Sequence, residues 1–330
     1  LPPVVVGFFE FVFMRSRDEL PMQEISRLFH EYMYEDDRFA HAVFGSETEV
    51  GRTLINEHAL PEGDYSEVLD WERASEVVKN ASALGVSMCA CRHKAGHMDE
   101  ACDAPVDVCM TLNAAAETMV RNGISRAITP EEGMDILEEC RAFGLVQVGD
   151  NVQRNLTYMC NCCGCCCGML NAIKRFEMTG AVATSNWVME VDAETCKGCG
   201  LCVEACPIDA IELVAAPTDK NPKRKRAVCA PELCLGCGVC KAVCKPDAIT
   251  MQPREQRVLP PESTYDRIVR MALERGKLAD LIFEDPQNLS YRALGRILSV
   301  IEKSPPARAA MAIKPLRSAF LSALVKKAQA

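Results

Sequence analysis

The sequence predicts an α+β protein with helical segments at both ends and cysteine-rich α+β domains in the middle. Apolar residues recur at helical spacing near both ends, short strand-like runs lie between them, and all 20 cysteines fall between Cys89 and Cys244. The expected divisions are a helical N-terminal region, a first cysteine-rich domain, a second cysteine-rich domain and a helical tail, over 1–82, 83–185, 186–255 and 256–330.

The composition is that of an ordinary water-soluble protein. The chain has 330 residues, of which 48% are hydrophobic and 25% charged, so it can bury a core without covalent crosslinks. Its formal charge of -9 argues against a general nucleic-acid binder. We find no signal peptide in the apolar stretch 1–13 and no run long enough to span a membrane, so we expect a reducing cytoplasm in which clustered thiols carry metal.

The strongest motif is a pair of cysteine runs with the spacing C-x2-C-x2-C-x3-C. Their flanking residues also match, so the two runs form an internal repeat. Zinc ribbons use paired C-x2-C knuckles rather than two interlocked runs of four, which favours iron–sulfur clusters over zinc. The cysteines of the first run are Cys196, Cys199, Cys202 and Cys206, and those of the second run are Cys234, Cys237, Cys240 and Cys244.

This repeat resembles the two-cluster bacterial ferredoxins, over about residues 191–251, and the whole chain is similar to cysteine-rich ferredoxin-like proteins of anaerobes. The resemblance implies two [4Fe–4S] clusters, with the fourth cysteine of each run bound to the other cluster. Lys245 stands where the family usually has proline, and the link over 214–230 is longer than usual. Its basic stretch 223–226 is interpreted as a solvated hairpin tip or a docking site for an acidic partner, and Cys229 as a spare buried cysteine. The implied ligand sets are Cys196, Cys199, Cys202 and Cys244 for one cluster, and Cys206, Cys234, Cys237 and Cys240 for the other.

A second and unusual group of cysteines precedes the repeat. Between its two halves we expect a helix over 111–122, a second helix that starts at the capping box Thr129-Pro130-Glu131-Glu132, and a strand over 144–148. Cys140 lies on the apolar face of the second helix and is expected in the core. The remaining cysteines are candidate metal ligands: Cys89, Cys91, Cys102, Cys109, Cys160, Cys162, Cys163, Cys165, Cys166 and Cys167.

Spacing leaves several groupings of these ten thiols open. The first four could bind one cubane, and Cys160, Cys163 and Cys166 could begin another because they repeat the C-x2-C-x2-C spacing. The doubled cysteines resemble the Cys-Cys-Gly motifs of heterodisulfide-reductase-type subunits, although the spacing differs, so a larger or non-cubane cluster is a further option. Zinc or copper is the remaining alternative. We expect at least one additional iron–sulfur cluster.

Arg92 could offset the negative charge of a thiolate-bound cluster, and His93 and His97 are either ligands, proton donors or polar loop residues. No catalytic residue is assigned, and no nucleotide-binding motif is present.

The predicted function is electron transfer, as a redox partner or a subunit of a larger complex. The alternatives are a reductase with a catalytic cysteine-rich cluster and a redox or metal sensor. Three helices are expected after Pro261, and the last, basic one over 306–327 could contact a membrane surface or a protein.

Overall fold

The computed structural model describes all of the chain except residues 1–6, 8–9, 17–18, 61–69, 218–220 and 279–330. The chain divides into two compact units, Leu1–Gly45 with Glu49–Thr264 and Ser46–Thr48 with Tyr265–Ala330. The expected helices over 289–303 and 306–327, and with them the expected membrane contact, lie outside the described residues. The division into four domains stays a prediction.

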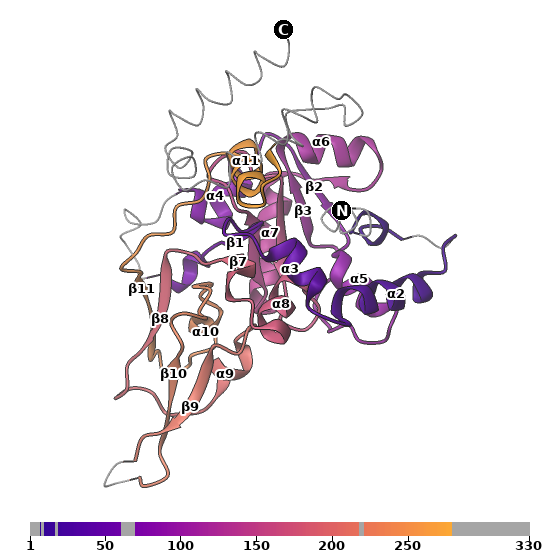
Figure 1. Cartoon of the computed structure of the whole chain (residues 1–330). Helices are drawn as coiled ribbons and strands as arrows, with labels where there is room; N and C mark the ends of the chain where they lie inside the picture. The colour runs from indigo at the N-terminus through magenta and orange to yellow at the C-terminus, as the bar shows by residue number, and fades with distance from the viewer. Residues whose placement is uncertain (1–6, 8–9, 17–18, 61–69, 218–220, 279–330) are drawn as a thin grey trace. The chain divides into compact units, whose positions relative to one another are not determined.

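A seven-stranded sheet forms the centre of the larger unit (Figure 1). Its strand order is β4-β2-β3-β6-β5-β1-β7. Neighbouring strands are antiparallel except for β1 and β7, which are parallel. The strands are β1 (Gly51–Thr53), β2 (Leu84–Ser87), β3 (Cys109–Leu112), β4 (Arg126–Ala127), β5 (Val146–Asp150), β6 (Tyr158–Cys162) and β7 (Val182–Ala183).

Strand β6 separates two hydrophobic clusters because successive side chains of a strand point to opposite faces. Met159 belongs to one cluster, and Cys160 and Cys162 to the other. The Met159 side of the sheet is covered by α4 (Ala74–Lys79) and α7 (Pro130–Ala142). The opposite side packs against α2 (Met22–Tyr34), α3 (Arg38–Phe44) and α8 (Gly168–Phe176). The remaining helices near this sheet are α5 (Ala90–Gly96) and α6 (Asn113–Arg121).

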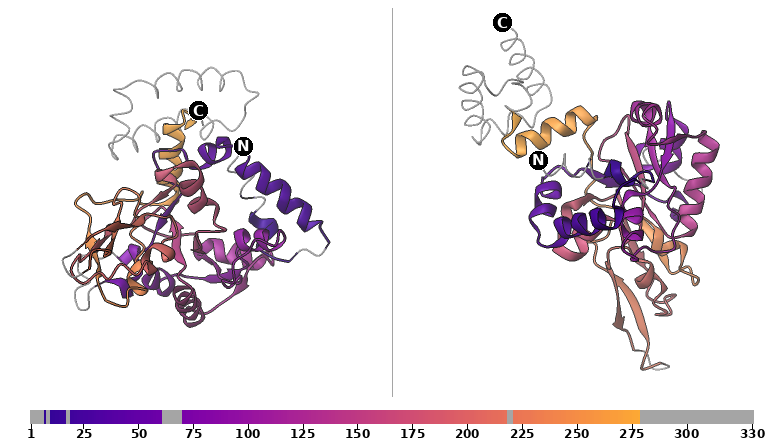
Figure 2. Two further views of the ribbon diagram at one scale, coloured as in Figure 1. Left: turned by 90° about the horizontal axis from the view of Figure 1, so that it is seen from below. Right: turned by 90° about the vertical axis from the view of Figure 1, so that its right-hand side faces the viewer.

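The second cysteine-rich region contains two antiparallel strand pairs and two short helices. Strand β8 (Trp187–Val191) pairs with β11 (Ile249–Pro253), and β9 (Ile211–Ala215) pairs with β10 (Lys225–Cys229). The short helices after the cysteine loops are α9 (Leu201–Ala205) and α10 (Val239–Ala242). The β9–β10 pair extends away from the central sheet (Figure 2).

Several expected elements are present. Thr129 caps α7, its side-chain oxygen accepting the Glu132 N–H at 3.2 Å, and Pro130 occupies the first turn. The N-terminal region, expected to be helical, also contains strand β1, which lies between β5 and β7 in the sheet. Three residues are too few to leave a strand period in the sequence. Strand β6 was not expected either, because its cysteines hide the alternation of its faces.

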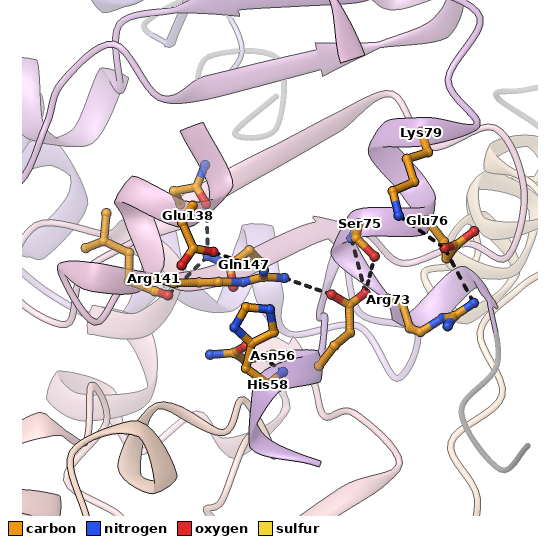
Figure 3. A network of polar contacts seen from close by, with 12 residues as sticks. Asn56, His58, Arg73, Ser75, Glu76, Lys79, Glu138, Arg141 and Gln147 are labelled. Atoms are coloured by element: carbon orange, nitrogen blue, oxygen red, sulfur yellow. Dashed lines mark hydrogen bonds and ion pairs between the residues drawn. The ribbon is translucent and has the colours of Figure 1, made fainter. Parts of the chain in front are cut away.

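A polar network holds the short helix η1 (Glu57–Ala59) against the sheet domain (Figure 3). Glu57 forms a buried ion pair with Arg141 of α7 at 2.9 Å and accepts a hydrogen bond from the Ser75 hydroxyl at 2.6 Å. At the start of this segment, the Asn56 N–H donates to the Cys237 carbonyl oxygen at 3.1 Å. The network therefore fixes a segment that borders the second ferredoxin-type cysteine loop.

The smaller unit is described over 46–48 and 265–278. Its main element is α11 (Thr264–Glu274), which matches the expected helix over 262–275. A carboxylate oxygen of Glu274 accepts the Thr48 N–H at 2.9 Å, and Arg275 donates to the Ser46 hydroxyl at 2.7 Å.

Candidate metal centres

The eight cysteines of the repeat surround two separate cavities. With the space open to solvent included, the first has a volume of about 350 Å³ and the second of about 340 Å³. The grouping is the one that the ferredoxin resemblance implies, in which each run supplies three cysteines to one cavity and the fourth to the other. Cys196, Cys199, Cys202 and Cys244 line the first cavity, and Cys206, Cys234, Cys237 and Cys240 line the second.

Glycine is required in both cysteine loops. Gly198 and Gly236 have φ values of 65° and 68°, a conformation that side chains other than glycine rarely adopt. A Cβ atom at Gly198 would lie 2.3 Å from the Lys225 carbonyl oxygen, and one at Gly236 would lie 2.1 Å from the Trp187 carbonyl oxygen. Each loop is therefore pressed against a strand, β10 for the first and β8 for the second. This close approach encloses the cavities and fits a cluster held by backbone N–H groups as well as thiolates.

Cys229 also lines the second cavity, where its thiol contacts that of Cys234. The second cavity is thus lined by five cysteines, one more than a cubane requires. Cysteine spacing assigns no role to Cys229, because this residue lies outside the C-x2-C-x2-C-x3-C pattern. Strand pairing brings it to the cavity, since Cys229 ends β10 opposite Ile211 of β9.

In the first cysteine-rich domain, the thiols divide into two groups, and the division differs from both groupings suggested by spacing. The sulfur tetrad consists of Cys102, Cys163, Cys165 and Cys166, whose Sγ atoms all lie within 4.8 Å of one another. Among the described residues, this tight grouping contains Cys102 without Cys89, Cys91 or Cys109, and Cys163 and Cys166 without Cys160. The cubane expected from the first four cysteines and the frame of Cys160, Cys163 and Cys166 stay predictions.

The other six cysteines form the six-cysteine group: Cys89, Cys91, Cys109, Cys160, Cys162 and Cys167. Thiol–thiol contacts connect five of them in a row, in the order Cys91, Cys167, Cys162, Cys160 and Cys109. Cys89 acts electrostatically on members of this row. Sheet register explains the contact between two of them, because Met110 of β3 pairs with Met159 of β6 and so places Cys109 beside Cys160.

The doubled cysteines divide between the two groups. Cys162 belongs to the hydrophobic cluster on one side of the sheet, whereas Cys163 packs against the cluster on the other side. The same division separates Cys166 from Cys167, the residue that precedes α8. Two adjacent cysteines can thus serve two different centres.

Arg92 lies between the two groups and is completely buried. One of its nitrogens donates to the Asn161 carbonyl oxygen at 2.5 Å, while Nε and Nη1 have no hydrogen-bond partner among the described residues. The cysteines that act on it electrostatically come from both groups: Cys89, Cys163, Cys162 and Cys102. A buried guanidinium without a carboxylate is costly, and metal binding to these thiols would place compensating negative charge beside it.

Burial and thiol contacts shift the pKa values of these cysteines. The pKa of Cys163 is lowered to about 5, first because the Cys166 thiol hydrogen-bonds to its thiolate, and also through a backbone N–H and Arg92. The pKa of Cys167 is lowered by thiol contacts with Cys162 and Cys91 and by the backbone N–H groups of Leu170 and Met169. In contrast, burial raises the pKa of Cys89 and of Cys237 to about 12. A metal ion at these two positions must therefore displace protons.

The two expected histidines lie on α5 and at its end. The His93 ring contacts the Phe13 carbonyl oxygen at 2.7 Å through Nδ1, and its Nε2 lies 3.1 Å from Nε2 of His97. Burial and the neighbouring His93 lower the pKa of His97. The described groups of metal-binding side chains contain neither histidine. Their role as ligands or proton donors stays a prediction.

The two cysteine-rich regions touch directly. A Cβ atom at Gly164, which lies between Cys163 and Cys165, would fall 2.3 Å from the carbonyl oxygen of Pro207. Pro207 follows Cys206, which lines the second ferredoxin-type cavity. Lys174 of α8 forms an ion pair with Asp209 in the same loop at 3.1 Å. Sequence reasoning missed this contact, although a lone glycine inside a run of cysteines is a sign of close backbone approach.

Comparison with known proteins supports 4Fe–4S binding by the second cysteine-rich region. Residues 195–248 match the family described as "4Fe-4S dicluster domain". The chain carries a 4Fe–4S ferredoxin-like domain. A domain of this kind holds 4Fe–4S clusters. A segment of 35 residues is 63% identical to an iron–sulfur subunit of the CoB–CoM heterodisulfide reductase of Methanopyrus kandleri. The match covers 11% of this chain and only 5% of that relative.

Among the described residues, no helix has the length and apolar character needed to cross a bilayer.

Proposed function

We propose that this chain relays electrons between a pair of [4Fe–4S] clusters and a further iron–sulfur centre held by the six-cysteine group, as a subunit or partner of a larger redox complex. The ferredoxin-type cysteines would hold the pair, with the four cysteines around each cavity binding one cluster. When bound, the clusters supply one-electron carriers. The chain's own residues fix the distance between these carriers and keep water out of the space between them.

The observation that supports this relay is one continuous hydrophobic cluster. It contains Cys162 and Cys167 of the six-cysteine group together with Ile208, and Cys206 and Cys237 of the second cavity pack against it. The two sets of sulfurs therefore share one apolar core. An electron that leaves the second cavity toward the six-cysteine group does not have to pass through solvent.

The six-cysteine group, with five of its thiols in a row, supports a polynuclear centre rather than one ion. Within the described part of the chain, no three of these six sulfurs lie within 4.8 Å of one another. Bridging metal atoms can span such a row, whereas a single tetrahedral ion cannot contact all of it. Arg92 would offset part of the negative charge that the centre gains on reduction.

The name of the matched reductase component supports a place in a multi-subunit redox enzyme. The basic residues 223–226, which include the start of β10, offer a surface for an acidic partner. The relative itself is described only as an iron–sulfur subunit of CoB–CoM heterodisulfide reductase. The electron donor and acceptor that we propose for this chain are one-electron carriers.

The full chain, purified without oxygen, tests the relay through the Cys160→Ser variant. We expect the wild type to hold more iron than the about eight atoms of two cubanes. The variant should lose the excess iron and its acid-labile sulfide, while the EPR signals of the reduced ferredoxin pair remain. In freeze-quench experiments after photoreduction, the electron should move from the pair to the further centre only in the wild type.

Cys140→Ala is the matched control, because Cys140 is fully buried but belongs to neither sulfur group. It should keep the wild-type iron and sulfide content. The relay is refuted if the wild type holds only about eight irons, or if Cys160→Ser keeps the full iron content and transfers electrons at the wild-type rate.

A further inference from the structure

The sulfur tetrad has the dimensions of a site for one metal ion. All four Sγ atoms lie within 4.8 Å of one another, and those of Cys165 and Cys166 are 3.7 Å apart. A tetrahedral ion with metal–sulfur bonds of about 2.3 Å needs sulfur–sulfur distances of about 3.8 Å. A cubane instead inserts four iron atoms between its thiolates and keeps the sulfurs farther apart.

The ferredoxin-type cysteines of the same chain provide an internal reference. They surround cavities of about 350 and 340 Å³. Among the described residues, no three of them lie within the 4.8 Å that encloses the whole sulfur tetrad. Where a cubane is expected, the chain thus leaves space for it, and at the tetrad it does not.

The tetrad loop is fixed by contacts that do not involve metal. The side-chain amide of buried Asn171 donates to the Cys165 carbonyl oxygen at 2.9 Å and to the Cys167 carbonyl oxygen at 3.0 Å. On its other side, Gly164 abuts the Pro207 backbone. Three of the four sulfurs are therefore presented by one braced loop, and Cys102 completes the set from a separate loop.

The charge around the tetrad is also suited to a metal ion. Four thiolates around a divalent ion leave a net charge of about −2, which needs a nearby cation when the site is partly buried. Arg92 is that cation. It is completely buried, two of its nitrogens lack a partner in the described structure, and Cys102 and Cys163 are among the thiols that act on it.

We propose that Cys102, Cys163, Cys165 and Cys166 bind a single tetrahedral divalent ion, zinc or ferrous iron, without inorganic sulfide. The site is separate from the six-cysteine group, and the proposal does not depend on the electron relay. It also explains the doubled cysteines. Cys163 and Cys166 belong to the sulfur tetrad, whereas their neighbours Cys162 and Cys167 belong to the six-cysteine group.

The test compares Cys102→Ser with the control Asp103→Asn in the full chain purified without oxygen. Cys102 is chosen because it lies outside the dense cysteine loop, and Asp103 is its exposed neighbour. We expect Cys102→Ser to lose about one zinc or iron per chain and no acid-labile sulfide, while Asp103→Asn loses neither. Zinc and iron analysis identifies which ion is bound, and either result supports the proposal.

A measurement on the wild type keeps the proposal falsifiable if the variant does not fold. After growth with cobalt in place of zinc, a tetrahedral tetrathiolate site should show intense visible d–d bands and a cobalt–sulfur shell at about 2.3 Å with no metal–metal shell. The proposal is overturned if Cys102→Ser loses several irons together with sulfide, or if neither cobalt, zinc nor sulfide-free iron is bound.

Discussion

In the ferredoxin-like domain, three sulfurs of the first cavity lie between Cys196 and Cys202, whereas the sulfur tetrad joins Cys102 to a loop that starts at Cys163. The first arrangement is encoded by local spacing and glycine. The second depends on which face of a sheet each cysteine occupies. Spacing therefore predicts ligand sets where a loop wraps around its cluster, and it misleads where strands present the sulfurs.

The largest expected effect concerns the ferredoxin-like domain, where local spacing and glycine set the ligands. Gly236→Ala should remove the second ferredoxin-type cluster, about four irons per chain, because the new Cβ would lie 2.1 Å from the Trp187 carbonyl oxygen at a positive φ. Iron analysis and EPR of the reduced protein measure the loss. Gly180→Ala is the matched control, since nothing lies within 4 Å of its added Cβ. Full iron content in Gly236→Ala would show that the loop is not braced as described.

The second prediction concerns two neighbouring residues. Cys162→Ser should lose iron and acid-labile sulfide together, whereas Cys163→Ser should lose about one metal ion and no sulfide. The reason is that these residues lie in hydrophobic clusters on opposite sides of the sheet. Both variants should keep the EPR signals of the ferredoxin-like domain. Identical losses of iron and sulfide in the two variants would mean that all ten cysteines serve one centre.

The effect of Arg92→Met on the free energy of unfolding should change sign with metal content. In the metal-loaded chain, removal of the buried cation between the two sulfur groups should lower the free energy of unfolding by about 3 kcal/mol. In the metal-free chain, the same substitution removes an uncompensated buried charge and should leave stability equal or higher. Denaturant unfolding before and after chelation measures both values. Exposed Arg126, paired with Glu132, supplies the control Arg126→Met, which should show no such reversal.

The smallest effect is expected far from the sulfurs. Thr129→Ala removes the side-chain cap of α7 and should lower the free energy of unfolding by about 1 kcal/mol. Iron, zinc and sulfide contents should not change. Thr118→Ala, within α6, is the control and should stay within about 0.5 kcal/mol of the wild type in urea unfolding. A loss of metal in Thr129→Ala would show that α7 helps to hold the metal centres.

Much of the fold follows from local signals. The capping box predicts the start of α7, and the helix expected over 111–122 corresponds to α6. The strands β1 and β6 escape such analysis. One is only three residues long, and the other alternates cysteines with Met159 and Asn161, so its two faces do not differ in an obvious way.

The sequence by itself determined that the chain contains a ferredoxin-like domain and that the thiols are too dense for a packing role. Fixed spacing and glycines act within single loops, so they need no knowledge of the rest of the fold. Only the tertiary structure decided how the ten other cysteines divide, that Arg92 lies buried between the two groups, and that Gly164 meets Pro207. Those relations depend on strand register and on contacts between residues far apart in the chain, which no local pattern records.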